Sequence, residues 1–473
     1  MLGHVNQQLA NANAWVSSFT KDEQGDPLPA RHIAIKAQQY IDEYMAAKST
    51  RRWVIVPGLR GVGKTTILAQ QYKYTQEKYG NRANLLHLSL HDVVNVVGGN
   101  LNLAIQQYEQ ILASSVEHLK KPTFLFLDEV QEDEKWADVL FSLHERSRNI
   151  FIFCTGSSAT RLRTNANIVR RSHIEPLYPL NYTEYQMLRF GLMPEIGLKA
   201  SLKEAVFASK DAAEAHSRLT NILPSIRSYR AKIDASTFTH FMYTGSLPFL
   251  VNETNPAQVY NGIISLIERI VNEDLAKGYN FDSPTLNAVQ SLLFMLADGD
   301  TLSRKSLSSA LGIDVRVLGE LLDALVKTEL LIGVPARGST TIAVTKPRKY
   351  LFMSPAIRAT FHQIAGVSAT DQARKGELLE DLVGLYMYRE FVTKRLASFT
   401  YNAGEGHADF ILQTTAGARI PIEVGLGKKT VRQVVTTMKE VKSTYGIVIS
   451  STSLGVSASN NILFLPLSIF YLM

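Results

Sequence analysis

Eight residues early in the chain have the types and the spacing of a phosphate-binding loop. Gly58-Leu59-Arg60-Gly61-Val62-Gly63-Lys64-Thr65 follows the pattern G-x-x-x-x-G-K-[ST]. Glycines let the backbone wrap closely around phosphates, so that N–H groups converge on the anion at the start of the next helix. Lys64 would place its charge on the β- and γ-phosphates, and the Thr65 hydroxyl would ligate Mg²⁺. We therefore predict a nucleotide site contacted by Gly58, Gly61, Gly63, Lys64, Thr65 and Thr66.

The elements around this loop have the order that such a site requires. The apolar run Trp53–Val56 is typical of a buried parallel strand and leads directly into the loop, and a helix-compatible segment follows Thr66. The alternative is a glycine-rich turn that matches the pattern by chance. Strand, loop and helix together favour the nucleotide site.

A second buried strand ends in two carboxylates. Residues 123–127 are apolar apart from Thr123, and Asp128 and Glu129 follow them. In a phosphate-loop sheet this is where the Mg²⁺-anchoring Asp belongs, so Asp128 would act on the metal through its water shell. Glu129 would be the general base that orients and deprotonates the attacking water. The alternative is a strand whose acidic end simply meets solvent.

A third apolar strand, residues 150–154, is followed by Thr155-Gly156-Ser157-Ser158. A hydroxyl at this strand end can hydrogen-bond the γ-phosphate or the attacking water, and Ser157 or Ser158 is the candidate. Alternatively, these serines cap the next helix.

Three further segments make the sequence similar to a known family. DEVQEDEKW, FCTGSSATRL and RRSHIEPLYPLNYTEY resemble, in this order, the motifs of a prokaryotic AAA-type ATPase family. The resemblance extends from about Arg31 to the C-terminus. It implies binding and hydrolysis of ATP with Mg²⁺, a helical lid, a winged helix and a C-terminal domain similar to PD-(D/E)XK nucleases.

The same resemblance points to individual side chains. Arg60 and Gln131 occupy positions typical of the family, and Arg171 matches the arginine of a Gly-Arg pair whose glycine is here Arg170. Either arginine could act as a finger on the γ-phosphate of a neighbouring subunit, which would make the protein a homo-oligomer. The alternative is a basic surface pair beside a helix end.

The sequence pattern predicts that the middle of the chain is helical. Beyond Tyr185 a polar, helix-rich region continues to about residue 280 and would form the lid. Three short amphipathic pieces then lie between residues 287 and 326, followed by strand candidates at 330–334 and 341–344. This order is that of a winged helix, a fold that binds DNA or serves in protein contacts. Basic residues that could contact phosphates are Arg316, Lys327, Arg337, Lys346, Arg348 and Lys349.

The C-terminal region places three carboxylates in a nuclease-like order. Glu380 lies on an amphipathic helix, Asp409 at a strand start and Glu423 on the next strand, where such groups hold Mg²⁺ in nucleases. The lysine that normally follows two residues after the Glu is replaced by Gly425, and Lys428 and Lys429 come later. A nuclease-like fold without cleavage is therefore the expectation; a working nuclease site is the alternative.

Composition sets the remaining bounds. The chain has 473 residues, 45% hydrophobic and 20% charged residues, a formal net charge of +7 and a pI near 9.2, as in a globular protein that can accept a phosphate-rich partner. One cysteine, Cys154, excludes an intramolecular disulfide and a thiolate-rich zinc site. The sequence shows no signal peptide and no apolar stretch of about 20 residues, so we expect a cytoplasmic protein without membrane insertion.

These observations predict an α/β protein with a P-loop NTPase parallel sheet and additional domains. We expect an N-terminal segment (1–28), an ATPase core (29–180), a helical lid (181–280), a winged helix (281–355) and a nuclease-like α/β domain (356–473). The expected function is that of an ATPase that couples nucleotide state to a DNA-binding winged helix and a degenerate nuclease-like domain. An ATP-gated DNA nuclease and a nucleotide-switched protein-binding scaffold are the alternatives.

Overall fold

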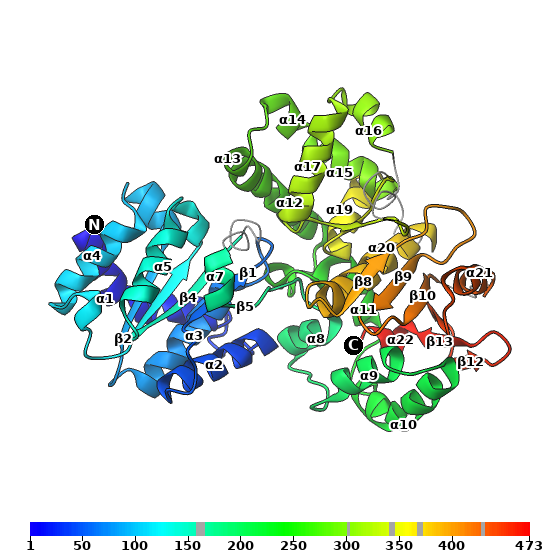
Figure 1. Ribbon diagram of the computed structural model, residues 1–473, viewed down its shortest axis with the longest axis horizontal. Coiled ribbons are helices and arrows are strands. Elements are labelled where there is room, and N and C mark those ends of the chain that lie inside the picture. The colour runs from blue at the N-terminus through cyan, green and yellow to red at the C-terminus, as the bar shows by residue number, and fades with distance from the viewer. Residues whose placement is uncertain (158–165, 300–302, 340–345, 367–371, 427–430) are drawn as a thin grey trace. The chain divides into compact units, whose positions relative to one another are not determined.

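The chain forms two compact units. One comprises Met1–Tyr178 with Lys327–Glu329, and the other comprises Pro179–Val326 with Leu330–Met473. The computed structural model describes residues 1–157, 166–299, 303–339, 346–366, 372–426 and 431–473 (Figure 1).

The first unit is built on a five-stranded parallel sheet with the strand order β2-β3-β4-β1-β5. The three apolar runs singled out in the sequence become adjacent strands at its centre, with Trp53 paired to Ile152 and Leu125 paired to the same residue from the other side. The carboxyl ends of these strands therefore meet at one edge, where the loop, the acidic pair and Ser157 lie. The strands are β1 (Trp53–Pro57), β2 (Asn84–Ser89), β3 (Thr123–Asp128), β4 (Ile150–Gly156) and β5 (His173–Ile174).

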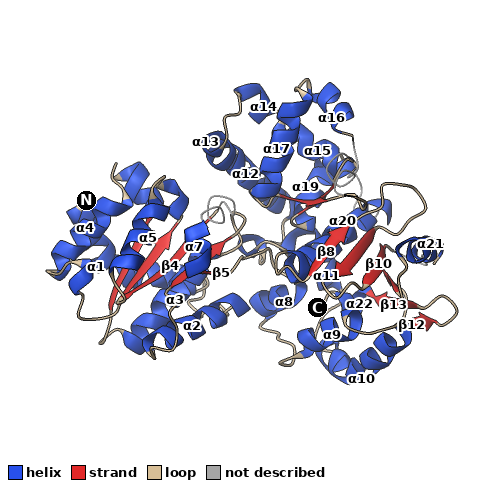
Figure 2. Ribbon diagram, in the orientation of Figure 1, coloured by secondary structure: helices blue, strands red, loops and turns tan. Residues whose placement is uncertain are grey.

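Helices cover both faces of this sheet (Figure 2). They are α1 (Leu2–Thr20), α2 (His32–Met45), α3 (Lys64–Tyr79), α4 (Leu101–Leu112), α5 (Trp136–Arg146) and α7 (Ala166–Arg171), with short helical turns η1 (Asp92–Val96), η2 (Val116–His118) and η3 (Val130–Glu132).

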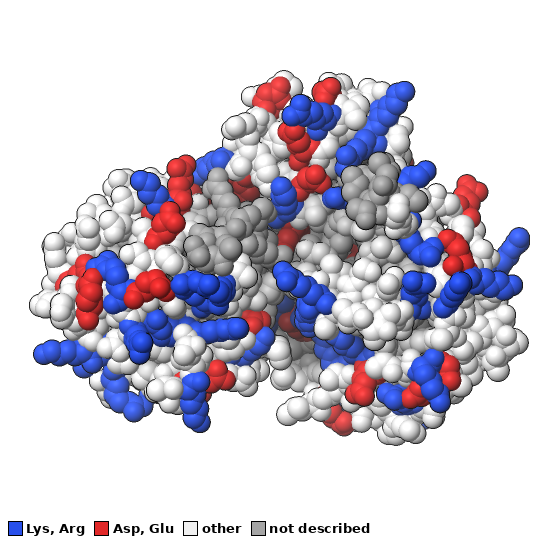
Figure 3. All heavy atoms as spheres, in the orientation of Figure 1, with Lys and Arg blue, Asp and Glu red and all other residues white. Residues whose placement is uncertain are grey.

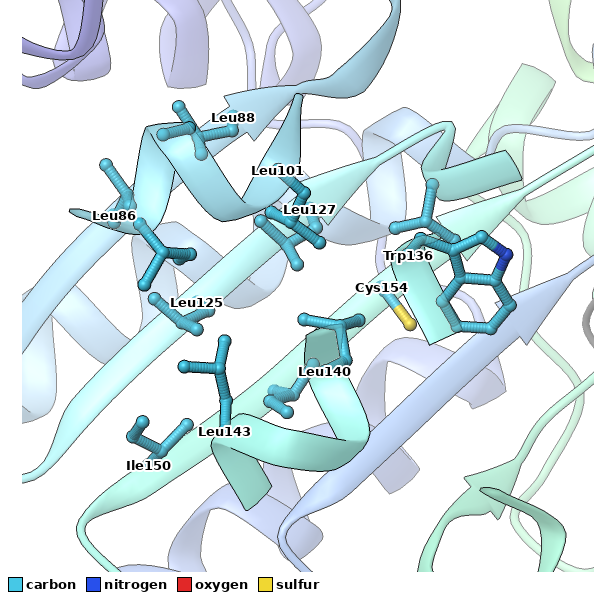
Figure 4. Packing of buried hydrophobic residues seen from close by; sticks show 14 of the residues in the cluster. Leu86, Leu88, Leu101, Leu125, Leu127, Trp136, Leu140, Leu143, Ile150 and Cys154 are labelled. Carbon is cyan, nitrogen blue, oxygen red and sulfur yellow. The ribbon is translucent and has the colours of Figure 1, made fainter. Parts of the chain in front are cut away.

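Successive side chains of a strand point to opposite faces of the sheet, so they pack against different helices. Leu125 and Leu127 of β3 pack with Leu140 and Leu143 of α5 in the cluster of Figure 4, whereas Phe124 and Phe126 point to the opposite face. There Tyr44 of α2 contacts Phe124, and Tyr72 of α3 contacts Phe126. A strand buried on both faces has no polar positions, which is why these segments read as continuous apolar runs.

Cys154 belongs to this core. It is fully buried, its Sγ accepts a hydrogen bond from Trp53 Nε1 at 3.3 Å, and burial raises the pKa of its thiol to about 12. The thiol therefore packs as a small apolar group and is not a nucleophile.

The second unit begins with helices that form the lid region. They are α8 (Tyr182–Phe190), α9 (Leu198–Phe207), α10 (Ala212–Arg230), α11 (Ser236–His240), α12 (Pro256–Arg269), α13 (Ala276–Gly278) and α14 (Ser283–Asn287), interrupted by the short turns η4 (Phe241–Gly245), η5 (Pro248–Leu250) and η6 (Ile270–Leu275).

Three helices and a two-stranded antiparallel sheet follow in the order expected for a winged helix: α15 (Val289–Asp298), α16 (Arg304–Leu311), α17 (Val315–Lys327), β6 (Leu331–Val334) and β7 (Lys349–Phe352). The predicted strand 341–344 lies outside the described residues. β6 pairs with 349–352, where the apolar Tyr350, Leu351 and Phe352 are buried.

The C-terminal part is a six-stranded mixed sheet with the order β12-β13-β11-β10-β9-β8. β8, β9 and β10 are antiparallel neighbours, and α21 connects β10 to the parallel strand β11. The elements are α19 (Pro355–Ile364), α20 (Gln372–Met387), η7 (Tyr388–Val392), β8 (Ala397–Thr400), β9 (Phe410–Thr414), β10 (Arg419–Val424), α21 (Arg432–Val441), β11 (Gly446–Ser450), β12 (Gly455–Ser457), β13 (Ile462–Pro466) and α22 (Leu467–Phe470).

A fully buried ion pair ties helices α19 and α20 to α15 and β7. Arg358 of α19 donates from Nε and Nη2 to Asp381 of α20 at 2.6 and 2.9 Å, and from Nη1 to two carbonyls at the end of α15 at 3.2 Å. Asp381 also accepts the Phe352 N–H of β7 at 2.9 Å. The network therefore joins α15, β7, α19 and α20 through one ion pair.

Among the described residues, no helix has both the length and the apolar character that crossing a bilayer requires.

This network generates a stability prediction. Arg358→Met leaves the Asp381 carboxylate buried without its cation, so we expect a loss of about 3–5 kcal/mol in the free energy of unfolding. All three tryptophans, Trp15, Trp53 and Trp136, lie in the first unit. The urea midpoint should therefore fall more when unfolding is followed by far-UV circular dichroism, which reports on both units, than when it is followed by tryptophan fluorescence, which reports on the first.

The matched control is Arg269→Met, because Arg269 is exposed and lies 3.5 Å from Glu273 one helical turn away. We expect a change below about 1 kcal/mol for that variant. Equal effects of the two substitutions would contradict a structural role for the buried pair.

Candidate active site

The loop between β1 and α3 depends on backbone conformations that glycine allows. Gly61 and Gly63 have φ values of +77° and +94°, which side-chain-bearing residues rarely adopt. At Gly58 a Cβ atom would lie 2.2 Å from the Leu177 carbonyl oxygen, so only glycine lets the loop leave β1 here. The sequence-predicted glycines therefore shape the loop.

Lys64 is the first residue of α3, and the loop curls around its side chain. The Nζ atom donates to the carbonyl oxygens of Gly58 at 3.1 Å and Leu59 at 3.2 Å, and the side chain is buried. Thr66 lies half-buried in the same first turn of α3. An ammonium group is thus held where the loop's N–H groups and the helix N-terminus converge, as anion binding requires.

Asp128, at the end of β3, links α3 to β4. The Thr65 hydroxyl donates to Asp128 Oδ2 at 2.7 Å, and the Thr155 hydroxyl donates to Asp128 Oδ1. Hydroxyl and carboxylate oxygens are the ligands that Mg²⁺ prefers, so Thr65 and Asp128 fit this metal. Thr155 was not singled out in the sequence, since only its place beside the apolar strand marks it.

Glu129 follows in a left-handed conformation, with φ +52° and ψ +48°. Left-handed backbone is uncommon outside glycine and concentrates at functional sites. Burial alone would raise the pKa of Glu129, but the positive charges of Lys64 and Arg60 outweigh it and hold the pKa below its ordinary value. Burial and the neighbouring Glu129 charge raise the pKa of Asp128. Glu129 is therefore an ionised carboxylate that can accept a proton.

Gln131 connects Glu129 to β4. Its Nε2 donates to Glu129 Oε2 and to Ser157 Oγ, the latter at 2.8 Å, and its Oε1 accepts the Ser157 N–H at 3.3 Å. Ser157 is thus brought to the acidic pair, as expected for a residue that senses the nucleotide. Ser158 lies outside the described residues.

Comparisons with known proteins agree with this geometry. A family model described as an AAA domain matches residues 50–186. Uncharacterized protein MJ1637 of Methanocaldococcus jannaschii is 34% identical over 446 residues, which cover 92% of this chain and 88% of that protein. An uncharacterized protein of Haemophilus influenzae is 24% identical over 153 residues, 32% of this chain and 37% of that protein.

This chain belongs to the family of the M. jannaschii protein and carries an AAA domain. Among solved structures, the Aeropyrum pernix ORC1 protein in complex with DNA is 12% identical and covers 74% of this chain and 96% of its own, with a TM-score of 0.34. AMPPCP-bound DnaA from Aquifex aeolicus is also 12% identical, covers 64% and 90%, and has a TM-score of 0.26. At such scores these likenesses carry no further conclusion.

A cavity of about 620 Å³ adjoins Thr65 and Asp128 of the AAA domain. Thr65 and Asp128 form one part of its wall, and helix α1 forms another, far outside the segment that matches the AAA domain. The remaining lining residues are Gln8, Asn11, Ala14, Trp15, Phe19, His87, Ser89 and Asp92. The N-terminal segment, to which the sequence assigned no role, therefore shapes the surroundings of the site.

Trp15 of α1 is held in this wall by stacking. Its ring lies 3.5 Å from the His87 ring at 16° and meets Tyr72 of α3 edge-on. Burial lowers the pKa of His87 to about 3, so its imidazole is neutral at physiological pH. An uncharged ring stacks on indole without adding a cation to the cavity that Thr65 and Asp128 also line.

The two candidate finger arginines differ in their surroundings. Arg171 Nε donates to Glu145 Oε1 at 2.8 Å, and its guanidinium lies 4.8 Å from the centre of the Phe141 ring. Arg170, the neighbouring residue on α7, is exposed. Arg171 is thus engaged within its own chain, whereas Arg170 faces solvent.

The predicted nuclease-like carboxylates are not gathered into a metal site. Glu380 forms an ion pair with Lys349, and Asp409 accepts the Val424 N–H at 2.7 Å beside Glu423. Within the part of the chain that the structure describes, no three His, Cys, Asp or Glu side chains lie together in a way that could hold a metal ion. Lys428 and Lys429 lie outside the described residues.

Several basic residues of the predicted winged helix form ion pairs. Arg337 pairs with Glu440 at 2.8 Å, Arg348 with Asp323 at 2.9 Å, and Lys349 with Glu380. Arg316 differs, because its side chain is 89% exposed and lies 3.4 Å from Glu320. Figure 3 shows the same mixture more widely, with Lys and Arg interspersed among Asp and Glu over the face drawn.

The segment after β6 is also paired with the C-terminal sheet. The Tyr401 N–H donates to the Pro335 carbonyl at 3.2 Å, and the Arg337 N–H donates to the Tyr401 carbonyl at 2.8 Å. The Tyr401 hydroxyl donates to the Pro347 carbonyl at 2.5 Å. One residue beyond β8 therefore contacts the chain both just after β6 and just before β7.

The loop geometry generates a binding prediction. Lys64→Ala removes the buried ammonium at the centre of the loop, so we expect affinity for Mg²⁺ and a slowly hydrolysed ATP analogue to fall about 10- to 100-fold in calorimetry. Lys73→Ala, on the outer part of the same helix, is the control and should bind as the wild type does. Unchanged affinity in Lys64→Ala would remove the loop as the phosphate site.

Proposed function

We propose that this AAA protein hydrolyses ATP to ADP and phosphate with Mg²⁺ at the edge formed by β1, β3 and β4. The observation that supports this most is the position of Asp128, which joins Thr65 of the phosphate loop to Thr155 while Glu129 follows it as an ionised carboxylate. Metal ligands, loop and base then occupy one edge of the sheet.

In this proposal each side chain has one task. Glu129 accepts a proton from a water whose oxygen attacks the γ-phosphorus, and the bond between this phosphorus and the β–γ bridging oxygen breaks. Lys64 balances charge on the β- and γ-phosphates, and Ser157 contacts the γ-phosphate or the water. Mg²⁺, when bound by Thr65 and Asp128, neutralises charge that develops on the phosphate oxygens.

We further propose that nucleotide state is coupled to a DNA-binding winged helix and to a nuclease-like domain that does not cleave. The helix order α15–α17 followed by β6 and β7 supports the winged helix. The order α20, β8, β9, β10, α21, β11, with a parallel β10–β11 pair, supports the nuclease-like fold. Gly425 at the lysine position and the Lys349–Glu380 pair support loss of cleavage.

An oligomer that completes its sites with an arginine finger is part of the same proposal. Its support is the exposure of Arg170 on α7, which leaves that guanidinium accessible to a neighbouring subunit. An ATP-gated nuclease and a nucleotide-switched protein scaffold are the competing functions, and the experiments below separate them.

The first experiment tests hydrolysis. Purified wild-type protein should release phosphate from ATP only with Mg²⁺, and Glu129→Gln should retain nucleotide affinity while kcat falls about 100-fold or more. Ordinary turnover in Glu129→Gln would remove Glu129 as the base. Absence of turnover in the wild type, with intact nucleotide binding, would favour a binding switch over an enzyme.

A second experiment tests the partner of the second unit. DNA binding measured by fluorescence anisotropy should weaken steeply between 50 and 200 mM salt, on the order of tenfold or more, because phosphate contacts release counterions. Arg316→Ala should weaken it roughly three- to tenfold, whereas Arg269→Ala, an exposed arginine on α12, should not. No DNA binding at low salt would favour the scaffold, and nicking that disappears in Asp409→Ala would favour the nuclease.

A further inference from the structure

One glutamine side chain touches both the candidate base and the candidate sensor. Gln131 is buried, its Nε2 donates to Glu129 Oε2 and to Ser157 Oγ, and its Oε1 accepts the Ser157 N–H. Two strands that carry separate parts of the reaction, β3 and β4, are thus joined by one carboxamide. The inference drawn from this contact rests on the hydrolysis proposed above.

The backbone explains why a residue two positions after Glu129 can reach its carboxylate. Glu129 is left-handed, and the helical turn η3 (Val130–Glu132) follows at once, closed by the Glu132 N–H on the Glu129 carbonyl at 3.0 Å. In an extended strand, side chains two apart point the same way but lie about 7 Å apart along the strand. The reversed backbone instead folds Gln131 back over the end of β3.

The hydrogen-bond pattern also fixes which end of the amide faces which partner. Glu129, when ionised, offers only acceptors, so it requires the NH₂ end of Gln131. The Ser157 N–H requires the oxygen end, and the Ser157 hydroxyl can accept from the same NH₂ group. A glutamate at position 131 would meet Glu129 with like charge, and an aliphatic residue would leave Glu129 and Ser157 without these contacts.

We propose that Gln131 is a positioning residue for ATP hydrolysis, which orients the Glu129 carboxylate and couples it to the contact that Ser157 makes with the γ-phosphate or water. Gln131 does not touch substrate in this scheme. Its effect passes through Glu129, so it governs the chemical step and leaves nucleotide binding to the phosphate loop.

If Gln131 had only a structural role, its variants would behave differently. If Gln131 only satisfied buried polar groups, its loss would lower stability and affect kcat and affinity together, independently of what stands at position 129. If it positions Glu129, its loss acts on kcat alone and disappears once Glu129 no longer serves as a base, because residues that act as a unit are not additive.

The experiment is a double-mutant cycle on the full-length protein. Wild type, Gln131→Ala, Glu129→Gln and the double variant are compared for kcat, for KM and for the dissociation constant of a fluorescent ADP analogue. We expect Gln131→Ala to lower kcat about 10- to 100-fold, because a misplaced base loses the aligned geometry of attack. The dissociation constant should change less than about twofold, and in the Glu129→Gln background Gln131→Ala should have almost no further effect.

Two further variants separate positioning from folding. Gln131→Met keeps the approximate size of the side chain but cannot donate to Glu129 and adds no charge. It should lose kcat as Gln131→Ala does, with a thermal unfolding midpoint closer to that of the wild type, because it leaves a smaller cavity. Gln71→Ala removes another fully buried glutamine, on α3, and should change stability without changing kcat.

The inference is overturned if wild-type protein hydrolyses ATP and Gln131→Ala keeps or raises kcat, or if the Gln131 and Glu129 effects multiply. Absence of hydrolysis in the wild type would instead refute the proposed function itself, so the two failures are distinct.

Discussion

The carboxylate of Asp128 is the constraint on which the site depends. It accepts hydroxyl hydrogen bonds from Thr65 on one side and Thr155 on the other, so α3, β3 and β4 are aligned at a single buried group. The core beneath supports this alignment, because residues of β3 and β4 pack against helices on both faces and leave the strands little freedom to shift. If Asp128 did not hold α3 and β4 together, the distance between the phosphate loop and Glu129 would vary.

The three central strands of the first unit, the phosphate loop and the start of α3 could be predicted from the sequence, because their signals are local. The run from Trp53 to Thr65 specifies strand, loop and helix within thirteen residues, and the apolar strands ending at Asp128 and Cys154 are legible for the same reason. Because both faces of these strands are buried, their sequences are continuous apolar runs and do not alternate between apolar and polar residues, so each strand is easy to recognise. The order of the strands then brings the predicted residues to one edge.

The contacts that were not predictable arise between segments distant in sequence or from backbone reversals. Thr155 is one of several hydroxyls near a strand end, and only the β3–β4 pairing assigns it to Asp128. The Arg358–Asp381 pair joins separate helices, and Lys349 reaches Glu380 from another strand. The pairing of β6 with β7 was not predicted, because Lys349–Phe352 is a short segment that lies about 15 residues beyond β6.

Helix α1 has a consequence for how the protein is handled. The segment recognised as an AAA domain begins at residue 50, yet Gln8, Asn11 and Trp15 border the space next to Thr65 and Asp128. A shortened protein that begins at residue 50 would lack α1 and its aromatic side chains. The cavity beside Thr65 and Asp128 would then be open to solvent on that side. Nucleotide binding measured on such a fragment would therefore not represent the site of the intact protein.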